Sequence, residues 1–98
     1  MSPSPGRLQF WMQESGGRLA EAIKHYLREE PLSKYDVWLI RAYLVQWIES
    51  PVWDMNPNLD AAGRAELQTL RQAAHKITSR RGINEWVEVA TDWGMDPL

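Results

Sequence analysis

The hydrophobic positions of residues 18–30 recur every three or four residues, the spacing that places them on one face of an α-helix. The positions between them carry charged side chains, which fall on the opposite face. Pro31 ends the pattern, because the residue before a proline avoids helical backbone angles. An amphipathic helix is therefore predicted over residues 18–30, and the residues that share its apolar face are Leu19, Ala22, Ile23, Tyr26 and Leu27.

Residues 34–49 show a different pattern, with apolar side chains almost all the way round the predicted helix. Ser33 is a good N-cap, Asp36 follows it at capping-box spacing, and Pro51 stops the helix. A helix that is apolar all round must be covered all round. We therefore predict that this helix is central, and that any face its neighbours leave uncovered meets another chain.

A third helix is predicted after Asp60, which can act as its N-cap while Leu59 packs as a hydrophobic staple. Gly63 weakens the first turn, because glycine costs about 1 kcal/mol relative to alanine inside a helix. The apolar stripe of this helix is narrow and consists of Leu67, Leu70, Ala74 and Ile77.

A fourth helix is predicted over residues 83–93, with Ser79 as a candidate cap and residues 80–82 as the joint before it. Gly94 suits the left-handed position that ends many helices, and Pro97 prevents continuation. The predicted apolar face of this helix consists of Ile83, Trp86, Val87, Ala90 and Trp93.

No stretch of the chain alternates apolar and polar residues with a period of two, and none repeats. The sequence therefore predicts an all-α fold, a small bundle of three to four antiparallel helices around the central apolar helix. Residues 7–98 are expected to form a single helical domain. Residues 1–6 contain Pro, Ser and Gly, which neither pack nor propagate a helix, so a flexible N-terminal tail is expected there.

Composition removes several classes of function. The chain has no cysteine, so disulfides, thiolate metal sites and cysteine nucleophiles are excluded. The first six residues do not resemble a secretory signal, and the longest apolar stretch is too short and too polar to cross a bilayer. A cytoplasmic protein without a membrane partner is therefore expected.

The formal net charge is −2, which gives no overall attraction to nucleic acid, but the charges are unevenly spread. Residues 82–98 carry only acidic charges, whereas residues 61–81 are rich in basic ones. The basic row could meet phosphates or a partner's carboxylates, complement the helix dipole, or pair with the acidic fourth helix. As an anion- or nucleic-acid-binding site it would use Arg64, Arg71, His75, Lys76, Arg80 and Arg81.

The two histidines are the natural candidates for chemistry. Glu21, His25 and Glu29 share one helix face and could ligate a divalent metal, but such spacings are usual on solvated helix faces. His75 could act as a catalytic base with Ser79, but Ser79 is better explained as a helix cap. No catalytic residues, metal site or cofactor are therefore predicted.

Six tryptophans are a large number for 98 residues. Those on predicted apolar helix faces are interpreted as core residues: Trp38, Trp47, Trp86 and Trp93. Trp53 lies in a proline-bounded loop, where it could fold back over a thin core or anchor a partner, and we favour the first role. Trp11 is equally suited to both roles.

Arg41 lies in the middle of the most apolar helix. If it is buried it must be paired, with Asp54 or an acid of the fourth helix as candidates. Alternatively it extends to solvent or receives an acidic group from a partner.

These observations predict a small non-enzymatic accessory or regulatory protein that acts by binding another protein of unknown identity, or as a homo-oligomer. The predicted partner-binding residues are Trp11, Arg41, Trp53 and Met55. The alternative is a nucleic-acid- or anion-binding module that uses the basic row, although nucleic acid is not the expected partner.

Overall fold

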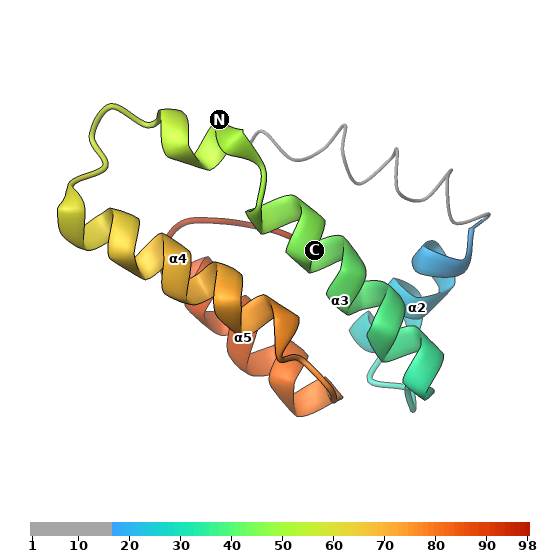
Figure 1. Cartoon of the computed structure of the whole chain (residues 1–98). Helices are drawn as coiled ribbons and strands as arrows, with labels where there is room; N and C mark the ends of the chain where they lie inside the picture. The colour runs from blue at the N-terminus through green and yellow to red at the C-terminus, as the bar shows by residue number, and fades with distance from the viewer. Residues whose placement is uncertain (1–16) are drawn as a thin grey trace.

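The computed structural model describes residues 17–98, which form a small helical bundle (Figure 1). Within these residues the structure contains no strand, as the sequence predicts. The predicted tail and Trp11 lie outside the described residues. The elements, in chain order, are α2 (Arg18–Leu27), α3 (Lys34–Ile48), the 3₁₀ helix η1 (Pro51–Met55), α4 (Ala61–His75) and α5 (Arg80–Asp92).

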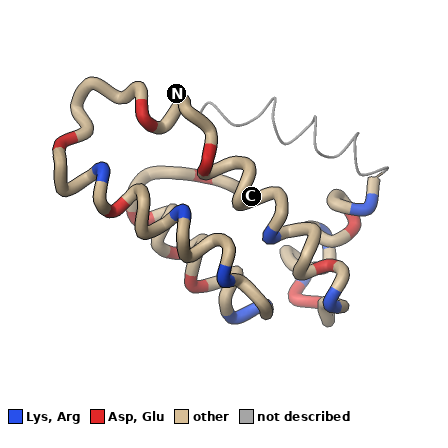
Figure 2. The backbone as a smooth tube through the Cα atoms, in the orientation of Figure 1, with Lys and Arg blue, Asp and Glu red and all other residues tan. Residues whose placement is uncertain are grey.

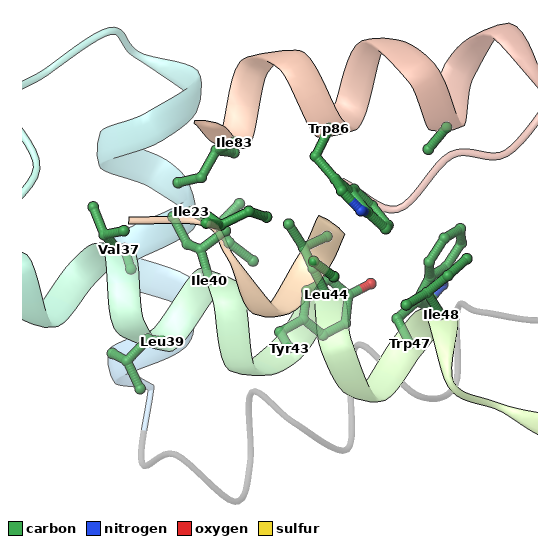
Figure 3. Close-up of a cluster of buried hydrophobic side chains, with 14 of the residues drawn as sticks. Ile23, Val37, Leu39, Ile40, Tyr43, Leu44, Trp47, Ile48, Ile83 and Trp86 are labelled. Carbon is green, nitrogen blue, oxygen red and sulfur yellow. The ribbon is translucent and has the colours of Figure 1, made fainter. Parts of the chain in front are cut away.

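Helix α3 contacts α2, α4 and α5, which confirms its predicted central position. Figure 3 shows its side chains entering a cluster that also receives Ile23 from α2 and Trp86 from α5. The largest fully buried side chains include Trp47 and Tyr43 of α3. No helix among residues 17–98 is long and apolar enough to cross a membrane.

Local capping chemistry determines where the helices begin. Ser33 and Asp36 form a complete capping box at the start of α3. Asp60 accepts a hydrogen bond of 2.7 Å from the Gly63 amide at the start of α4. Ser79 accepts one of 3.2 Å from the Gly82 amide, so α5 begins at Arg80 rather than at residue 83.

The end of α5 follows the predicted glycine signal. Gly94 adopts φ 84°, the Gly94 amide donates to the Thr91 carbonyl, and the Met95 amide donates to the Ala90 carbonyl. These two bonds form a Schellman motif. The chain then turns back over the bundle, where the buried Tyr43 hydroxyl donates to the Pro97 carbonyl at 2.6 Å.

Helix α2 ends in the same way, but with a glutamate in the left-handed position. Glu29 has φ 57°, and the Glu30 amide donates to the His25 carbonyl at 2.9 Å. Arg80 of α5 donates to the carbonyls of His25, Tyr26 and Glu30. One arginine therefore satisfies the carbonyls of this corner and ties α2 to the start of α5.

Close packing of the preceding loop explains why α4 contains a glycine at position 63. A Cβ atom at this position would lie 2.7 Å from Leu59 Cδ1, so the glycine leaves room for the half-buried Leu59 side chain. The predicted weak point in the first turn is thus a place where the preceding loop packs closely on the helix.

The prediction that Trp38 belongs to the core is wrong. Trp38 is 50% exposed and Tyr35 is 48% exposed, so α3 keeps an uncovered strip along its first turns. The other three helix-borne tryptophans lie in the core or against it: Trp47, Trp86 and Trp93.

Candidate functional site

The uncovered strip of α3 presents two aromatic rings in contact. Tyr35 and Trp38 are one helical turn apart, and their rings stack with centroids 6.0 Å apart and planes inclined by 12°. Arg18 of α2 restrains this pair from one side. Its guanidinium carbon lies 5.9 Å from the centroid of the Tyr35 ring, and its Nη1 donates to the Tyr35 hydroxyl at 3.3 Å.

A surface hollow of about 390 Å³ continues this strip along α3. Trp38 and Arg41 stand at one side of it, and His75 of α4 closes the other. Arg41 is half-buried, yet among residues 17–98 its side chain forms no hydrogen bond and no ion pair. The remaining lining residues are Ala42, Val45 and Gln46. We call Tyr35, Trp38, Arg41 and this hollow the α3 surface.

Asp54, a candidate partner for Arg41 in the sequence, pairs with a different arginine. Arg71 of α4 binds both carboxylate oxygens of Asp54 at 2.8 and 3.2 Å. This hydrogen bonding, opposed by burial, holds the pKa of Asp54 below its ordinary value. Arg71 is therefore committed to a contact between α4 and η1.

Two other predicted partner-binding residues lie away from the α3 surface, in η1. Trp53 is half-buried, its Nε1 donates to the Trp47 carbonyl at 2.8 Å, and its ring meets that of Trp47 edge-on at 4.7 Å. Met55 is 74% exposed. Trp53 and Met55 line another hollow of about 390 Å³, which shares no lining residue with the hollow beside Arg41.

The residues of the predicted basic row do not form one surface, although Figure 2 shows basic positions along α4 and at the start of α5. Arg71 and Arg80 donate to groups within the bundle. Arg81 pairs with Glu85 at 3.0 Å. His75 Nε2 lies 2.7 Å from Oε1 of Glu49, the C-cap residue of α3, a contact that sequence proximity does not reveal.

Arg64 and Lys76 complete the basic row, and within the described part of the chain neither side chain donates a hydrogen bond or forms an ion pair. Lys76 faces a groove between α4 and α5, whereas Arg71 and His75 line a hollow on another side of α4.

The groove between α4 and α5 is the larger feature, with a volume of about 580 Å³. Its floor is apolar and includes Leu70 and Ile77, and the exposed Val89 stands on its α5 side. Glu66 on α4 and Lys76, the C-cap of that helix, are its charged residues on the α4 side. This groove was not predicted from the sequence, although the positions 66, 69, 73 and 76 follow the alternating three- and four-residue spacing of a helix-packing seam.

Two of the candidate metal ligands on α2, Glu21 and His25, lie near oppositely charged or titratable side chains instead. Lys24 lies 3.7 Å from Glu21, and His25 Nδ1 lies 3.6 Å from Asp36 of α3. Burial raises the pKa of Asp36, but its hydrogen bonds with Ser33 and the nearby His25 together outweigh burial and hold that pKa below its ordinary value. Residues 17–98 contain no group of three or more His, Asp or Glu side chains arranged to hold a metal ion.

No protein-family model, curated protein or solved structure matches this chain. The interpretation of its surfaces therefore depends on their own geometry and chemistry.

Proposed function

We propose that this protein is a small non-enzymatic accessory or regulatory protein that binds another protein through the α3 surface. The observation that carries the proposal is the stacked pair of Tyr35 and Trp38, half-exposed beside Arg41, whose side chain has no ion-pair partner among residues 17–98. Large aromatic rings with this exposure lose unfavourable contact with water when a partner covers them.

The residue types support a protein partner. Tryptophan, tyrosine and arginine are the residues most enriched among those that dominate binding energy at protein interfaces. Arg18 already restrains Tyr35 before any partner arrives. Less side-chain freedom is therefore lost on binding, which favours affinity.

Arg41 adds a chemical preference to this surface. Its guanidinium offers five N–H donors in a planar fork, a geometry that suits a carboxylate. The hollow beside it has a mixed lining, with the apolar Ala42 and Val45 next to Gln46 and His75. The proposed partner segment therefore carries an acidic side chain for Arg41.

The basic-row alternative gains no support from the geometry, because four of its six residues already hold partners within the bundle. An electrophoretic shift on mixed DNA or RNA at low salt tests it. A shift that disappears as salt rises would favour that alternative over the protein-binding proposal.

The test of the proposal is affinity capture from the native cell lysate, followed by a titration with the purified partner. In the capture experiment we expect the wild type to retain a stoichiometric partner and Trp38→Ala to lose it. In the titration we expect Trp38→Ala to bind the partner at least tenfold more weakly than the wild type. Arg41→Gln tests the predicted carboxylate contact in the same titration.

Val52→Ala is the matched control, because Val52 is also an exposed apolar residue, at 45%, but belongs to η1. All variants are first shown to keep the wild-type helical signal and melting temperature. Equal capture by the wild type, Trp38→Ala and Arg41→Gln would rule out the α3 surface as the binding site.

A further inference from the structure

We propose that the groove between α4 and α5 is a self-association surface, and that its occupant is α4 of a second copy of this chain in antiparallel orientation. The groove is open, its floor is apolar, and it lies apart from the α3 surface. Figure 1 shows α4 and α5 side by side. The inference is independent of the proposed function, because no residue of one surface belongs to the other.

The charges along α4 indicate a second copy as the occupant. Glu66 and Lys76 both line the groove, ten residues apart, so about 15 Å of helix separates them. That distance is too long for an ion pair within one chain, and neither residue has an ion-pair partner among residues 17–98. Both charges therefore remain available to another molecule.

An antiparallel copy of α4 satisfies both charges at once. A two-fold axis that crosses α4 midway between Glu66 and Lys76 places each glutamate opposite the partner's lysine, and the same axis places Thr69 opposite the partner's Ala73. This is the pairing of an antiparallel helix seam, in which positions spaced by three and four residues alternate. A parallel copy would instead set like charges against each other.

The side chains between the two charges allow a close approach. Thr69 and Ala73 are small and exposed, and the Thr69 hydroxyl is already occupied by a 3.1 Å bond to the Ala65 carbonyl. Val89 and Trp93 on the α5 side of the groove supply apolar surface to cover. Glu85, the other acid of the groove, is already neutralised by Arg81 at 3.0 Å.

The size of this surface sets the expected affinity. Helix α4 has 15 residues and is therefore about 22 Å long. Two packed helices are about 20 Å wide, so the face covers roughly 440 Å² in projection. Stable interfaces bury about 800 Å² of accessible surface on each partner. We therefore expect a reversible dimer with a micromolar dissociation constant.

The test is sedimentation equilibrium of the full chain over a range from about 1 to 500 μM, which brackets micromolar dissociation constants. Wild type is expected to shift from monomer to dimer. Glu66→Lys and Lys76→Glu each place like charges in both symmetric contacts, so each weakens the dimer about tenfold at low salt. The double variant Glu66→Lys with Lys76→Glu recreates both pairs in reverse and restores dimerisation.

Arg64→Glu is the matched control. It reverses an exposed charge on the same helix, but Arg64 does not line the groove, so the dissociation constant is expected to stay unchanged. A monomer at every concentration overturns the proposal. So does a dimer that is indifferent to Glu66→Lys, or a double variant no better than the single variants.

A second measurement does not depend on charge. The chain has no cysteine, so Thr69→Cys and Ala73→Cys can be prepared as separate proteins with one thiol each. The antiparallel seam predicts that oxidation of their mixture yields mainly the mixed disulfide. Two equally abundant homodimers, or no cross-link, would contradict the seam even if a variant in the charge series were unstable.

Discussion

Arg71 on α4 binds the Asp54 carboxylate in η1 through both terminal nitrogens, at 2.8 and 3.2 Å. The same side chain donates from Nε to the Ile48 carbonyl at 2.8 Å and from Nη2 to the Ser50 carbonyl at 3.3 Å. It is only 13% exposed. One arginine thus holds the end of α3, the following 3₁₀ helix and α4 together.

Arg71→Lys should therefore destabilise the fold. A lysine cannot reproduce the planar fork that reaches Asp54 and the two carbonyls together. We expect a loss of about 1–3 kcal/mol in the free energy of unfolding, measured by urea denaturation. Arg64→Lys on the same helix should change it by less than about 0.5 kcal/mol. Equal effects of the two substitutions would show that the Arg71 contacts contribute nothing specific.

Glu29→Gly should stabilise the protein. Glu29 holds a left-handed backbone conformation that is unfavourable for residues with a Cβ atom and ordinary for glycine. The Glu29 side chain is exposed, so little packing is lost. We expect a gain of about 0.5–1 kcal/mol in the free energy of unfolding, partly offset by the greater freedom of glycine in the unfolded chain. Thermal melts measure this gain. Glu30→Gly, one residue later, should bring none.

Two tryptophan-to-phenylalanine substitutions should have unequal costs. The buried Trp86 indole donates to the Leu70 carbonyl at 2.9 Å, whereas the buried Trp47 Nε1 has no hydrogen-bond partner in the described residues. Trp86→Phe loses volume and a hydrogen bond, so we expect a cost of about 2–4 kcal/mol.

Trp47→Phe loses volume too, but it also removes an unsatisfied buried donor. We expect the free energy of unfolding to change by no more than about 1.5 kcal/mol. Denaturant unfolding followed by far-ultraviolet circular dichroism compares the two variants without relying on tryptophan emission. A larger cost for Trp47→Phe than for Trp86→Phe would contradict this interpretation.

Acid should weaken the fold through two aspartates. The pKa values of Asp36 and Asp54 in the folded chain lie below their ordinary value of 3.8. The unfolded chain therefore takes up protons first as the pH falls, so their contribution is complete above about pH 5 and is lost as the pH falls through the folded pKa values. Thermal melts from neutral to acidic pH should show this decline. Asp36→Asn should lower stability at neutral pH and make the acid decline shallower, whereas an unchanged slope would exclude Asp36 as a contributor.

The sequence predicts the helices well because their signals are local. Ser33, Asp60 and Ser79 each act within three residues of their own position, and Gly94 ends α5 through its own backbone angle. The short 3₁₀ helix after Pro51 was not predicted, because one turn carries too little periodicity to distinguish it from a loop.

The surfaces were harder to predict, for two physical reasons. Helix α3 is apolar on every side, so its pattern does not indicate that the side with Trp38 faces out. The roles of Arg71 and Arg80 depend on acceptors far away in the chain, which only packing brings near. A charge pattern therefore predicted a basic row, whereas the folded chain uses two of its six residues, Arg71 and Arg80, to hold separate elements together.

Trp47 has the rings of Trp53 and Trp86 set edge-on to it, with centroids 4.7 and 6.3 Å away. The three indoles come from η1, α3 and α5, so both of these ring contacts form only when all three elements are assembled. This cluster gives the protein a built-in optical reporter in the near ultraviolet. Loss of that signal while the far-ultraviolet signal persists would identify a state with formed helices and an unlocked core.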